Sequence, residues 1–500
     1  MVLSIENAKN GEKTAKIDNY FVHSAYSPQK EAEKFVLNIQ TNINPQTIVL
    51  IEPGLSYCYS LLKEKYPNSK IGIIRFSNLF EKYNSNWDFC LNFYDNFINN
   101  FELSIKNLLS EDLICSTVFI NWVPTQNIFY EQNNLLWQKL KIITENARTI
   151  LITRQFFEKK WLLNLCNFIK YANLFSLKNI NQNNKNIVIT ASGPSLKNTI
   201  PIIKKYRHKI FLICLSSACS VLQKNKLQAD LYISTDGGFW AGEHLKPLLN
   251  STRPLLLSTE SFCKKQILSK NIIIPGNYND GISSEIFNEL NEQKLYSVLL
   301  NRNGTVSGTA LDFAKNITTK NIYLLGLDLA GSKSFQHTNP NIIEKNSEIK
   351  NNKISNTETR QRKSQFNSKS LEIYRDWFSN YSNTNNVFRV IDYPNGKLGT
   401  INDIFSSKFE IILSQENEES QTSDLTINKI KINKNELCKK IYNIINKKIF
   451  TEKWQQQLFP LDYVAKNNTT SDNQKELLEN KIKQNTEKLL KKIRTILNDN

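Results

Sequence analysis

The chain has 500 residues, enough for two or three domains. Its 64 Lys and Arg residues outnumber its 46 Asp and Glu residues, so the formal net charge is +18 and anionic partners are favoured. We expect no nucleic-acid partner, because the sequence lacks a dense stripe of Arg and Lys with interleaved aromatic residues and is rich throughout in Asn, Lys and Ile. An anionic small molecule fits the charge better.

The first residues lack the apolar core of a signal peptide, and no run reaches the roughly 18 apolar residues of a membrane span. The eight cysteines are scattered and include no CxxC pair. This usage is typical of buried thiols in a reducing compartment and not of disulfides or a zinc site. The sequence therefore predicts a cytoplasmic protein without a membrane span, and it leaves the oligomeric state open.

Residues 1–180 are predicted to form an α/β domain with a Rossmann-like sheet. Strand and helix patterns follow one another as in a βαβ unit. They lie at residues 47–51, 56–66 and 70–76, with further strand patterns at 117–121 and 149–153. The first loop contains Gly54 but lacks the other glycines of a dinucleotide fingerprint. We therefore favour a scaffold or partner-docking role for this domain.

Residues 181–410 are predicted to form a central Rossmann-like domain, because alternating strand and helix patterns are typical of a mostly parallel, helix-covered sheet. An apolar run at 187–189 leads into a turn of small residues and then into an amphipathic run. The turn contains Ser192, Gly193, Pro194 and Ser195. Either this is an ordinary β-to-α turn, or the free N–H groups at the helix start bind a phosphate and Gly193 leaves room for it.

A second hydroxyl-rich loop opens a predicted helix over residues 306–317. The strand pattern that follows, 322–325, ends at Gly326, Leu327 and Asp328. Hydroxyl groups at a helix start and polar groups at a strand's carboxyl end suit a nucleotide site in an open α/β sheet. The candidate ligand-binding residues of the loop are Thr305, Ser307, Gly308 and Thr309.

Residues 332–369 contain few large apolar residues and are predicted to be a disordered insert or an active-site lid. A helix over 371–381, a strand over 387–391 and a turn over 394–399 are expected to follow. In residues 425–500, apolar residues recur at helical spacing and lysines cover the other face. This pattern predicts a C-terminal helical domain that packs on the chain or on a partner; a basic membrane-surface helix is the alternative.

The Ser-Gly-Pro-Ser turn, the Ser-Gly-Thr helix start and the strand ending in Gly-Leu-Asp resemble the central domain of the motility-associated factor (Maf) glycosyltransferases, also described as 6-hydroxymethylpterin diphosphokinase MptE-like. More distantly, they resemble bacterial sialyltransferases that use a CMP-activated sugar. The resemblance covers roughly residues 185–405. It implies an enzyme without metal or cofactor that transfers a nonulosonic acid, of pseudaminic or legionaminic type, from a CMP-sugar to Ser or Thr of flagellin.

Transfer to a hydroxyl benefits from a general base that titrates near neutral pH, as histidine does. The resembled family has a histidine after the Gly-x-Asp-Leu-Ala element, here His337, so His337 and Asp328 are the predicted catalytic residues. His244 is the alternative base, and either histidine could instead be a loop or capping residue. Asp236 ends a strand pattern, where it would bind the nucleotide-sugar or form a turn before two glycines. No second Asp pairs with it, so no metal site is predicted.

Two other functions stay open on the sequence. A pterin diphosphokinase would transfer diphosphate from ATP and would need magnesium held by carboxylates, to which Asp236 and Asp328 could contribute. A flagellin-binding protein that keeps the fold without catalysis is the other. Both rivals predict a different response to nucleotides from that of a CMP-sugar-dependent transferase.

Overall fold

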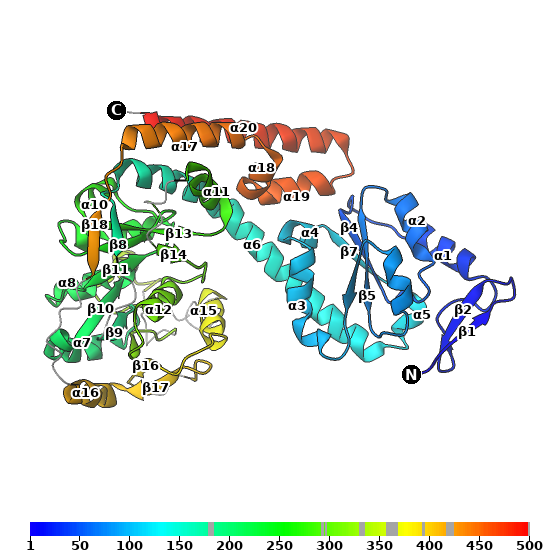
Figure 1. The fold of residues 1–500 in the computed structure, drawn as a ribbon, viewed down its shortest axis with the longest axis horizontal. Helices are drawn as coiled ribbons and strands as arrows, with labels where there is room; N and C mark the ends of the chain where they lie inside the picture. Colours follow the sequence, from blue (N-terminus) through cyan, green and yellow to red (C-terminus); the bar gives the residue numbers. More distant parts are fainter. Residues whose placement is uncertain are drawn as a thin grey trace. The chain divides into compact units, whose positions relative to one another are not determined.

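The computed structural model describes residues 1–178, 185–291, 295, 298–329, 336–356, 369–392, 396–416 and 425–498. The chain divides into two compact units (Figure 1). Unit 1 consists of Met1–Glu158 and Phe450–Lys488, and unit 2 consists of Lys159–Ile449 and Leu489–Asn500. This division differs from the three consecutive domains expected from the sequence, because the helices after residue 425 are shared between the two units.

Unit 1 is built on a four-stranded parallel sheet in the order β6-β5-β4-β7. All five side chains of β4 are buried, because parallel strands covered on both faces read as continuous apolar runs. The Rossmann-like α/β prediction is correct here. The strands are β4 (Thr47–Ile51), β5 (Lys70–Arg75), β6 (Phe89–Asn92) and β7 (Thr117–Asn121). The helices are α1 (Pro28–Leu37), α2 (Cys58–Lys65), α3 (Phe97–Leu108), α4 (Glu111–Cys115) and α5 (Val123–Gln126). A small antiparallel sheet precedes them, with β1 (Leu3–Asn7), β2 (Lys13–Ile17) and β3 (Tyr20–Phe21).

The crevice between the carboxyl ends of β4 and β7 is filled by the chain itself. The Val22 carbonyl accepts a hydrogen bond from Trp122 Nε1 at 2.8 Å, and His23 Nε2 accepts one from the Leu55 N–H at 2.9 Å. Strand order reverses at this point, which is where open α/β sheets bind ligands. The segment at Val22 and His23 therefore occupies that position, and the scaffold role of unit 1 stays a prediction.

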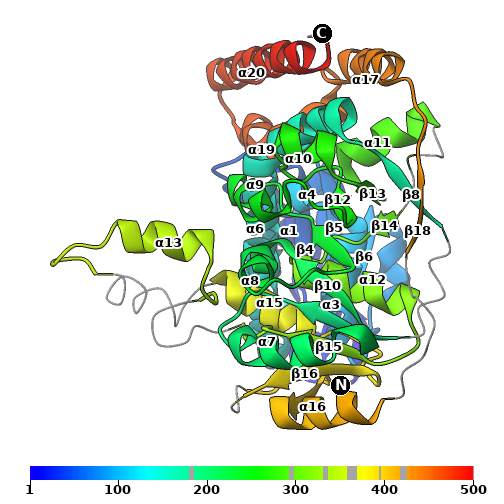
Figure 2. The ribbon, with the colours of Figure 1, turned by 90° about the vertical axis from the view of Figure 1, so that its left-hand side faces the viewer.

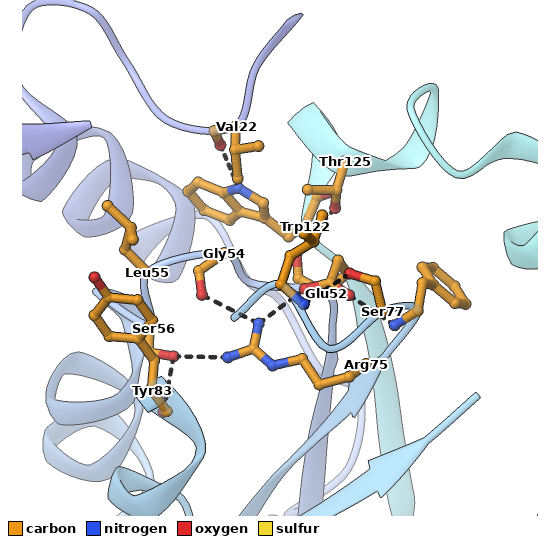
Figure 3. A network of polar contacts seen from close by, with 12 residues as sticks. Val22, Glu52, Gly54, Leu55, Ser56, Arg75, Ser77, Tyr83, Trp122 and Thr125 are labelled. Carbon is orange, nitrogen blue, oxygen red and sulfur yellow. Dashed lines mark hydrogen bonds and ion pairs between the residues drawn. The ribbon is translucent and has the colours of Figure 1, made fainter. Parts of the chain in front are cut away.

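A buried ion pair lies beside this crevice (Figure 3). Arg75 Nη1 is 2.9 Å from Glu52 Oε1, and both side chains have no exposed surface. The guanidinium also donates to the Gly54 carbonyl and to Ser56 Oγ, at 3.1 and 3.2 Å. The second carboxylate oxygen of Glu52 accepts from the Phe76 N–H at 2.6 Å. These hydrogen bonds satisfy both buried charges and fix the loop after β4.

The prediction of a strand at residues 149–153 is wrong. The segment lies inside α6 (Tyr130–Tyr171), a helix of 42 residues that runs from unit 1 into unit 2. Its run of Thr, Ile and Leu has strand-like composition, but the surrounding buried positions follow a helical period. Those positions are Leu136, Leu140, Ile143, Ala147 and Leu151.

Unit 2 contains a nine-stranded sheet in the order β14-β13-β12-β11-β10-β9-β15-β16-β17, and every adjacent pair is parallel. The central-domain prediction of a mostly parallel sheet is therefore correct. The strands are β9 (Asn186–Thr190), β10 (Ile210–Leu215), β11 (Leu231–Ser234), β12 (Leu255–Ser258), β13 (Ile273–Tyr278), β14 (Val298–Leu300), β15 (Ile322–Leu325), β16 (Val387–Ile391) and β17 (Asn402–Phe405).

The strand order of this sheet reverses between β9 and β15. From β9, the next five strands step outward on one side, whereas β15, β16 and β17 step outward on the other. The chain that leaves β9 continues to β10 and the chain that leaves β15 continues to β16, in opposite directions along the sheet. A crevice of this kind is where ligands bind in open α/β sheets.

Helices pack against the sheet. The helix α12 (Val306–Ile317) packs against β9, β10 and β11 through buried residues such as Ala310, Leu311 and Ala314. The helix α13 (Ile342–Ile349) extends outward from the unit (Figure 2). The other helices are α7 (Leu196–Lys205), α8 (Cys219–Lys224), α9 (Phe239–His244), α10 (Lys265–Lys270), α11 (Gly281–Leu290), α15 (Lys369–Ser379) and α16 (Ser406–Gln415).

The helix at 371–381 and the strand at 387–391 are confirmed. Of the segment predicted as an insert or lid, residues 336–356 are described and contain α13, and the rest of it before α15 lies outside the described residues. The expected turn at 394–399 lies partly outside them as well.

The C-terminal helical prediction is correct, although its helices do not form a domain of their own. An antiparallel pair of strands, β8 (Phe175–Lys178) and β18 (Thr426–Lys429), precedes these helices. The helices are α17 (Lys434–Lys448), α18 (Glu452–Leu458), α19 (Pro460–Asn468) and α20 (Asp472–Asn498). Among the described residues, no helix is long and apolar enough to cross a membrane.

Candidate active site

The structure brings the predicted Ser-Gly-Pro-Ser turn and Asp328 together at the crevice between β9 and β15. The Gly193 N–H donates to the Gly326 carbonyl at 2.8 Å. Ser195 donates twice to the Asp328 carboxylate, from its N–H at 2.8 Å and from its hydroxyl at 2.5 Å. Residues 133 positions apart in the sequence thus form one structure at the reversal of strand order.

Asp328 occupies the position at the start of α7 that a ligand phosphate would take. Its carboxylate is buried, which raises its pKa, while the hydrogen bonds from Ser195 oppose that shift. A helix start favours an anion of either origin, because its N–H groups and dipole are positive. The amino end of α7 therefore binds a carboxylate of its own chain through the Ser195 N–H.

Gly193 is required by this contact between loops. A Cβ atom at this position would lie 2.5 Å from both Asp328 Oδ2 and the Gly326 carbonyl oxygen. The two alternatives expected from the sequence were an ordinary β-to-α turn and a space left at Gly193 for a phosphate. In the structure, the space is filled by Asp328 and the Gly326 backbone.

The loop that carries His337 lies across the same turn. The Thr338 N–H donates to the Ser192 carbonyl at 2.7 Å, and its hydroxyl donates to the Pro194 carbonyl at 3.4 Å. The backbone carbonyls of Ser192 and Pro194 thus both accept hydrogen bonds from Thr338. They also place His337 beside the crevice, where the sequence predicted a catalytic base.

Glu344 holds the His337 imidazole. Its Oε1 atom lies 3.0 Å from His337 Nδ1 and accepts hydrogen bonds from the Gln336 and His337 N–H groups, each at 3.0 Å. The Glu344 side chain is 5% exposed and that of His337 is 24% exposed. A carboxylate at Nδ1 favours the tautomer in which Nδ1 carries the proton and Nε2 is the basic nitrogen. This arrangement suits a general base.

Glu344 was missed by the sequence analysis. It lies in the first turn of α13, where Asn341 caps the helix by accepting from the Ile343 N–H at 2.9 Å. The Asn341 amide also donates to the Ser217 carbonyl at 3.3 Å, which ties the helix start to the loop after β10. An Asn followed three residues later by Glu is a helix-start signal that could have located this residue.

His244, the alternative base, ends α9 and is buried. Burial, and then the nearby charge of His337, lower its pKa to about 4. The two histidines are therefore close enough to interact, but His244 stays neutral across the physiological range. Its environment suits a packed residue better than a proton acceptor that must become charged.

Asp236 is exposed and forms a turn. Its Oδ1 atom accepts a hydrogen bond from the Gly238 N–H at 2.7 Å, which agrees with the turn-forming alternative. Its charge also raises the pKa of Tyr374 on α15, as an addition to the larger effect of burial. Asp236 therefore lies near α15 with one carboxylate oxygen engaged by the backbone.

The hydroxyl-rich loop caps α12. Thr305 Oγ1 accepts from the Gly308 N–H at 3.0 Å and lies 2.6 Å from Ser307 Oγ, and Thr309 is buried. A Cβ atom at Gly308 would lie 2.9 Å from the ring of Trp377, so this glycine lets α15 pack against the start of α12. Helix capping by Thr305 and close packing at Gly308 thus explain two of the residues that were predicted to bind the nucleotide.

A charged cluster that the sequence analysis missed lies at the carboxyl ends of β12 and β14. Arg302 forms a two-pronged ion pair with Glu260, at 2.8 and 2.9 Å, and its Nε donates to Asp280 at 2.7 Å. The guanidinium lies 4.2 Å from the ring centroid of Tyr278 and 5.1 Å from that of Trp161. Its donors are directed at two carboxylates of the chain, so its positive charge is already paired within the cluster.

Within the described ranges, no group of three or more His, Cys, Asp or Glu side chains is arranged to hold a metal ion. Asp236 and Asp328 do not form the carboxylate cluster that a magnesium-dependent kinase would need, because each is engaged by backbone or hydroxyl donors at a different loop.

The part of the chain that carries this site has a recognisable family match. Residues 159–334 match the family described as 6-hydroxymethylpterin diphosphokinase MptE-like. The match begins in α6 and ends just after β15, so it covers the strand-order reversal and Asp328, while His337 and Glu344 follow it. The resemblance inferred from the two short turns is therefore supported for this MptE-like segment.

Two further similarities extend beyond the MptE-like segment. An uncharacterized protein of Treponema pallidum (strain Nichols) is 29% identical over 275 residues, which cover 54% of this chain and 59% of that relative. A solved structure titled as a Maf glycosyltransferase from Magnetospirillum magneticum AMB-1 superposes with a TM-score of 0.60 at 12% identity, covering 99% of this chain and 92% of that one. At this identity the likeness establishes a shared fold.

Proposed function

We propose that unit 2 is a glycosyltransferase in which His337 is the general base. The observation that carries the proposal is the His337–Glu344 pair, held against the Ser192–Ser195 turn at the reversal of strand order. The shared fold with a protein titled as a glycosyltransferase supports the class of reaction. The net charge of +18 favours a negatively charged donor.

The donor that we propose is a CMP-activated nonulosonic acid, and the acceptor is a Ser or Thr hydroxyl of flagellin. In the reaction, the acceptor oxygen forms a bond to the anomeric carbon while the bond from that carbon to the phosphate oxygen breaks. His337 Nε2 takes the hydroxyl proton, and Glu344 stabilises the resulting imidazolium through Nδ1. The departing CMP carries the electron pair of the broken bond.

A pterin diphosphokinase is the second candidate, because the matched family carries that description. That reaction depends on magnesium bridging the phosphates of ATP. The engagement of Asp236 and Asp328 by hydrogen-bond donors of the chain favours the transferase.

Nucleotide-dependent thermal stabilisation separates the candidates. CMP is expected to raise the Tm of the full chain with EDTA present, whereas ATP with magnesium is expected to have no comparable effect. A shift seen with ATP and magnesium alone would favour the kinase. The transferase is then tested directly by release of CMP from a CMP-nonulosonic acid in the presence of flagellin, with His337→Ala as the inactive control.

A further inference from the structure

A groove of about 670 Å³ lies in unit 2, apart from the candidate active site. It is bounded by the end of α6, by α10 and by the segment that joins β18 to α17. Leu174, which lines the groove, forms an isolated parallel β-bridge with Ile273, the first residue of β13. The groove therefore lies toward the amino ends of the strands, whereas His337 lies at their carboxyl ends. Its volume is within the range of about 300–1,000 Å³ typical of small-molecule sites.

The groove is lined by positive charge. Lys429, Lys431 and Lys434 contribute to its walls, and none of the described residues that line it is acidic. Glu436, in the first turn of α17, instead pairs with Lys440 at 3.0 Å. The described residues that line the groove thus include three lysines and no carboxylate.

Two more lysines surround the aromatic ring in the groove wall. The Nζ atoms of Lys265 and Lys170 lie 4.7 and 5.6 Å from the ring centroid of Tyr171. Lys170 also donates to the Ile496 carbonyl at 2.6 Å, which fixes its position. Both ammonium groups lie near the Tyr171 ring, so positive charge borders the aromatic part of the groove wall.

Bringing these lysines together has an electrostatic cost. Partial burial lowers the pKa of Lys434, and the charge of Lys429 lowers it further. Like charges gathered around a concave surface raise the local concentration of anions. A bound anion would relieve the repulsion between Lys429 and Lys434.

We propose that this groove is a second ligand site that binds a phosphate-bearing anion. Lys429, Lys431 and Lys434 pair with the phosphate oxygens as point charges. Tyr171, Ile430 and Ile432 cover the organic part of the ligand. The phosphate belongs to a soluble phosphorylated compound or to the head group of an anionic lipid, and both present the same chemistry to the lysines. The site does not depend on the activity proposed for His337.

Calorimetric titration of the full chain with pyrophosphate in about 150 mM salt tests the site, because salt at this level screens diffuse surface attraction. We expect saturable binding that becomes at least tenfold weaker in Lys429→Gln/Lys434→Gln. The matched control, Lys439→Gln/Lys447→Gln, removes two charges from exposed positions of α17 outside the groove and is expected to bind within twofold of the native chain. Absence of binding, or an equal loss in both variants, would overturn the proposal.

A second measurement needs no variant. Lysine acetylation of the native chain, followed by mass spectrometry, is expected to slow at Lys429 and Lys434 when pyrophosphate is added and to stay unchanged at Lys439. Equal rates with and without pyrophosphate at all three lysines would contradict the site.

Co-sedimentation then identifies the source of the phosphate. Vesicles containing phosphatidylglycerol pellet the native chain but not Lys429→Gln/Lys434→Gln if a lipid head group is the ligand. They leave both in solution if the ligand is a soluble phosphorylated compound. Equal pelleting of both would show that the groove is not where lipid binds.

Discussion

The Glu344 carboxylate and the His337 imidazole form a hydrogen-bonded pair, with Oε1 and Nδ1 separated by 3.0 Å. The same oxygen receives the backbone N–H of His337, so ring and backbone are held by one buried group. Carboxylate–histidine pairs of this kind fix the tautomer and stabilise the imidazolium that forms during proton transfer. The first prediction concerns this pair.

Replacing His337 with Ala is expected to lower glycosyl transfer by roughly a hundredfold or more, the usual contribution of a general base. Replacing Glu344 with Ala is expected to lower it by about tenfold to a hundredfold, because the ring loses its orientation. The affinity for CMP, measured by calorimetry, is expected to change little in either. The control is His208→Ala. His208 is exposed and lies just before the amino end of β10, whereas His337 lies at the carboxyl ends of the strands. Full activity in His337→Ala would remove this residue from the mechanism.

The second prediction concerns Gly193. In Gly193→Ala, the Cβ atom meets the Gly326 carbonyl, which is backbone and cannot rotate away, so the loops must separate. We expect a loss of about 1–3 kcal/mol in stability, the usual cost of overpacking. Thermal unfolding of Gly304→Ala is the comparison, because that site has open space and a positive φ of 68°, so only backbone strain is added. A smaller loss at position 193 than at position 304 would contradict the role of the Gly193 contact.

The third prediction concerns the buried Glu52–Arg75 pair of unit 1. Glu52→Gln leaves a buried guanidinium without its counter-charge, and we expect a loss of about 3–5 kcal/mol. Glu102→Gln breaks an exposed pair with Lys106 and is expected to cost less than about 1 kcal/mol. Chemical denaturation followed by fluorescence measures both. Equal effects of the two substitutions would mean that the buried network does not stabilise the loop after β4.

The fourth prediction concerns pH. The pKa of His244 is lowered to about 4, mainly by burial, from an ordinary value near 6.5. The unfolded chain therefore binds this proton more readily than the folded one, and stability falls as pH decreases from about 6.5 to about 4. At full effect the loss is roughly 3 kcal/mol. His244→Gln removes the titration, so its stability is expected to vary less with pH over this window than that of the native chain. Parallel profiles for the two proteins would contradict the lowered pKa.

The sequence was sufficient to predict the parallel sheet of unit 2, because its strands are continuous apolar runs separated by turn residues and amphipathic helices. The turn at Ser195 and the strand end at Asp328 were each predicted as parts of the site, because both follow strands of the predicted sheet. The partner that fills the amino end of α7 was not predictable. That contact joins two loops that are 133 residues apart in the sequence. A local pattern of small residues is the same whether the helix start binds a ligand phosphate or Asp328, so the pattern cannot distinguish the two.

The strand prediction at residues 149–153 had a different cause of error. A five-residue run of Thr, Ile and Leu fits a strand by composition, and only the longer stretch from Leu136 to Leu151 reveals the helical period. Glu344 was overlooked because the surrounding segment was interpreted from its polarity alone. Whether the turn and loop residues bind a nucleotide remains a prediction.

Unit 1 is discontinuous in the sequence, since it contains both Met1–Glu158 and Phe450–Lys488. Gln155 donates to Asp462 at 2.9 Å, and Gln456 donates to Asp112, so the late helices contact the early ones directly. A ribosome that synthesises this chain completes most of unit 2 before it reaches α18 and α19. The early part of unit 1 is therefore synthesised well before the last helices that pack on it. For the same reason, a recombinant fragment that ends at residue 158 would lack part of its own core.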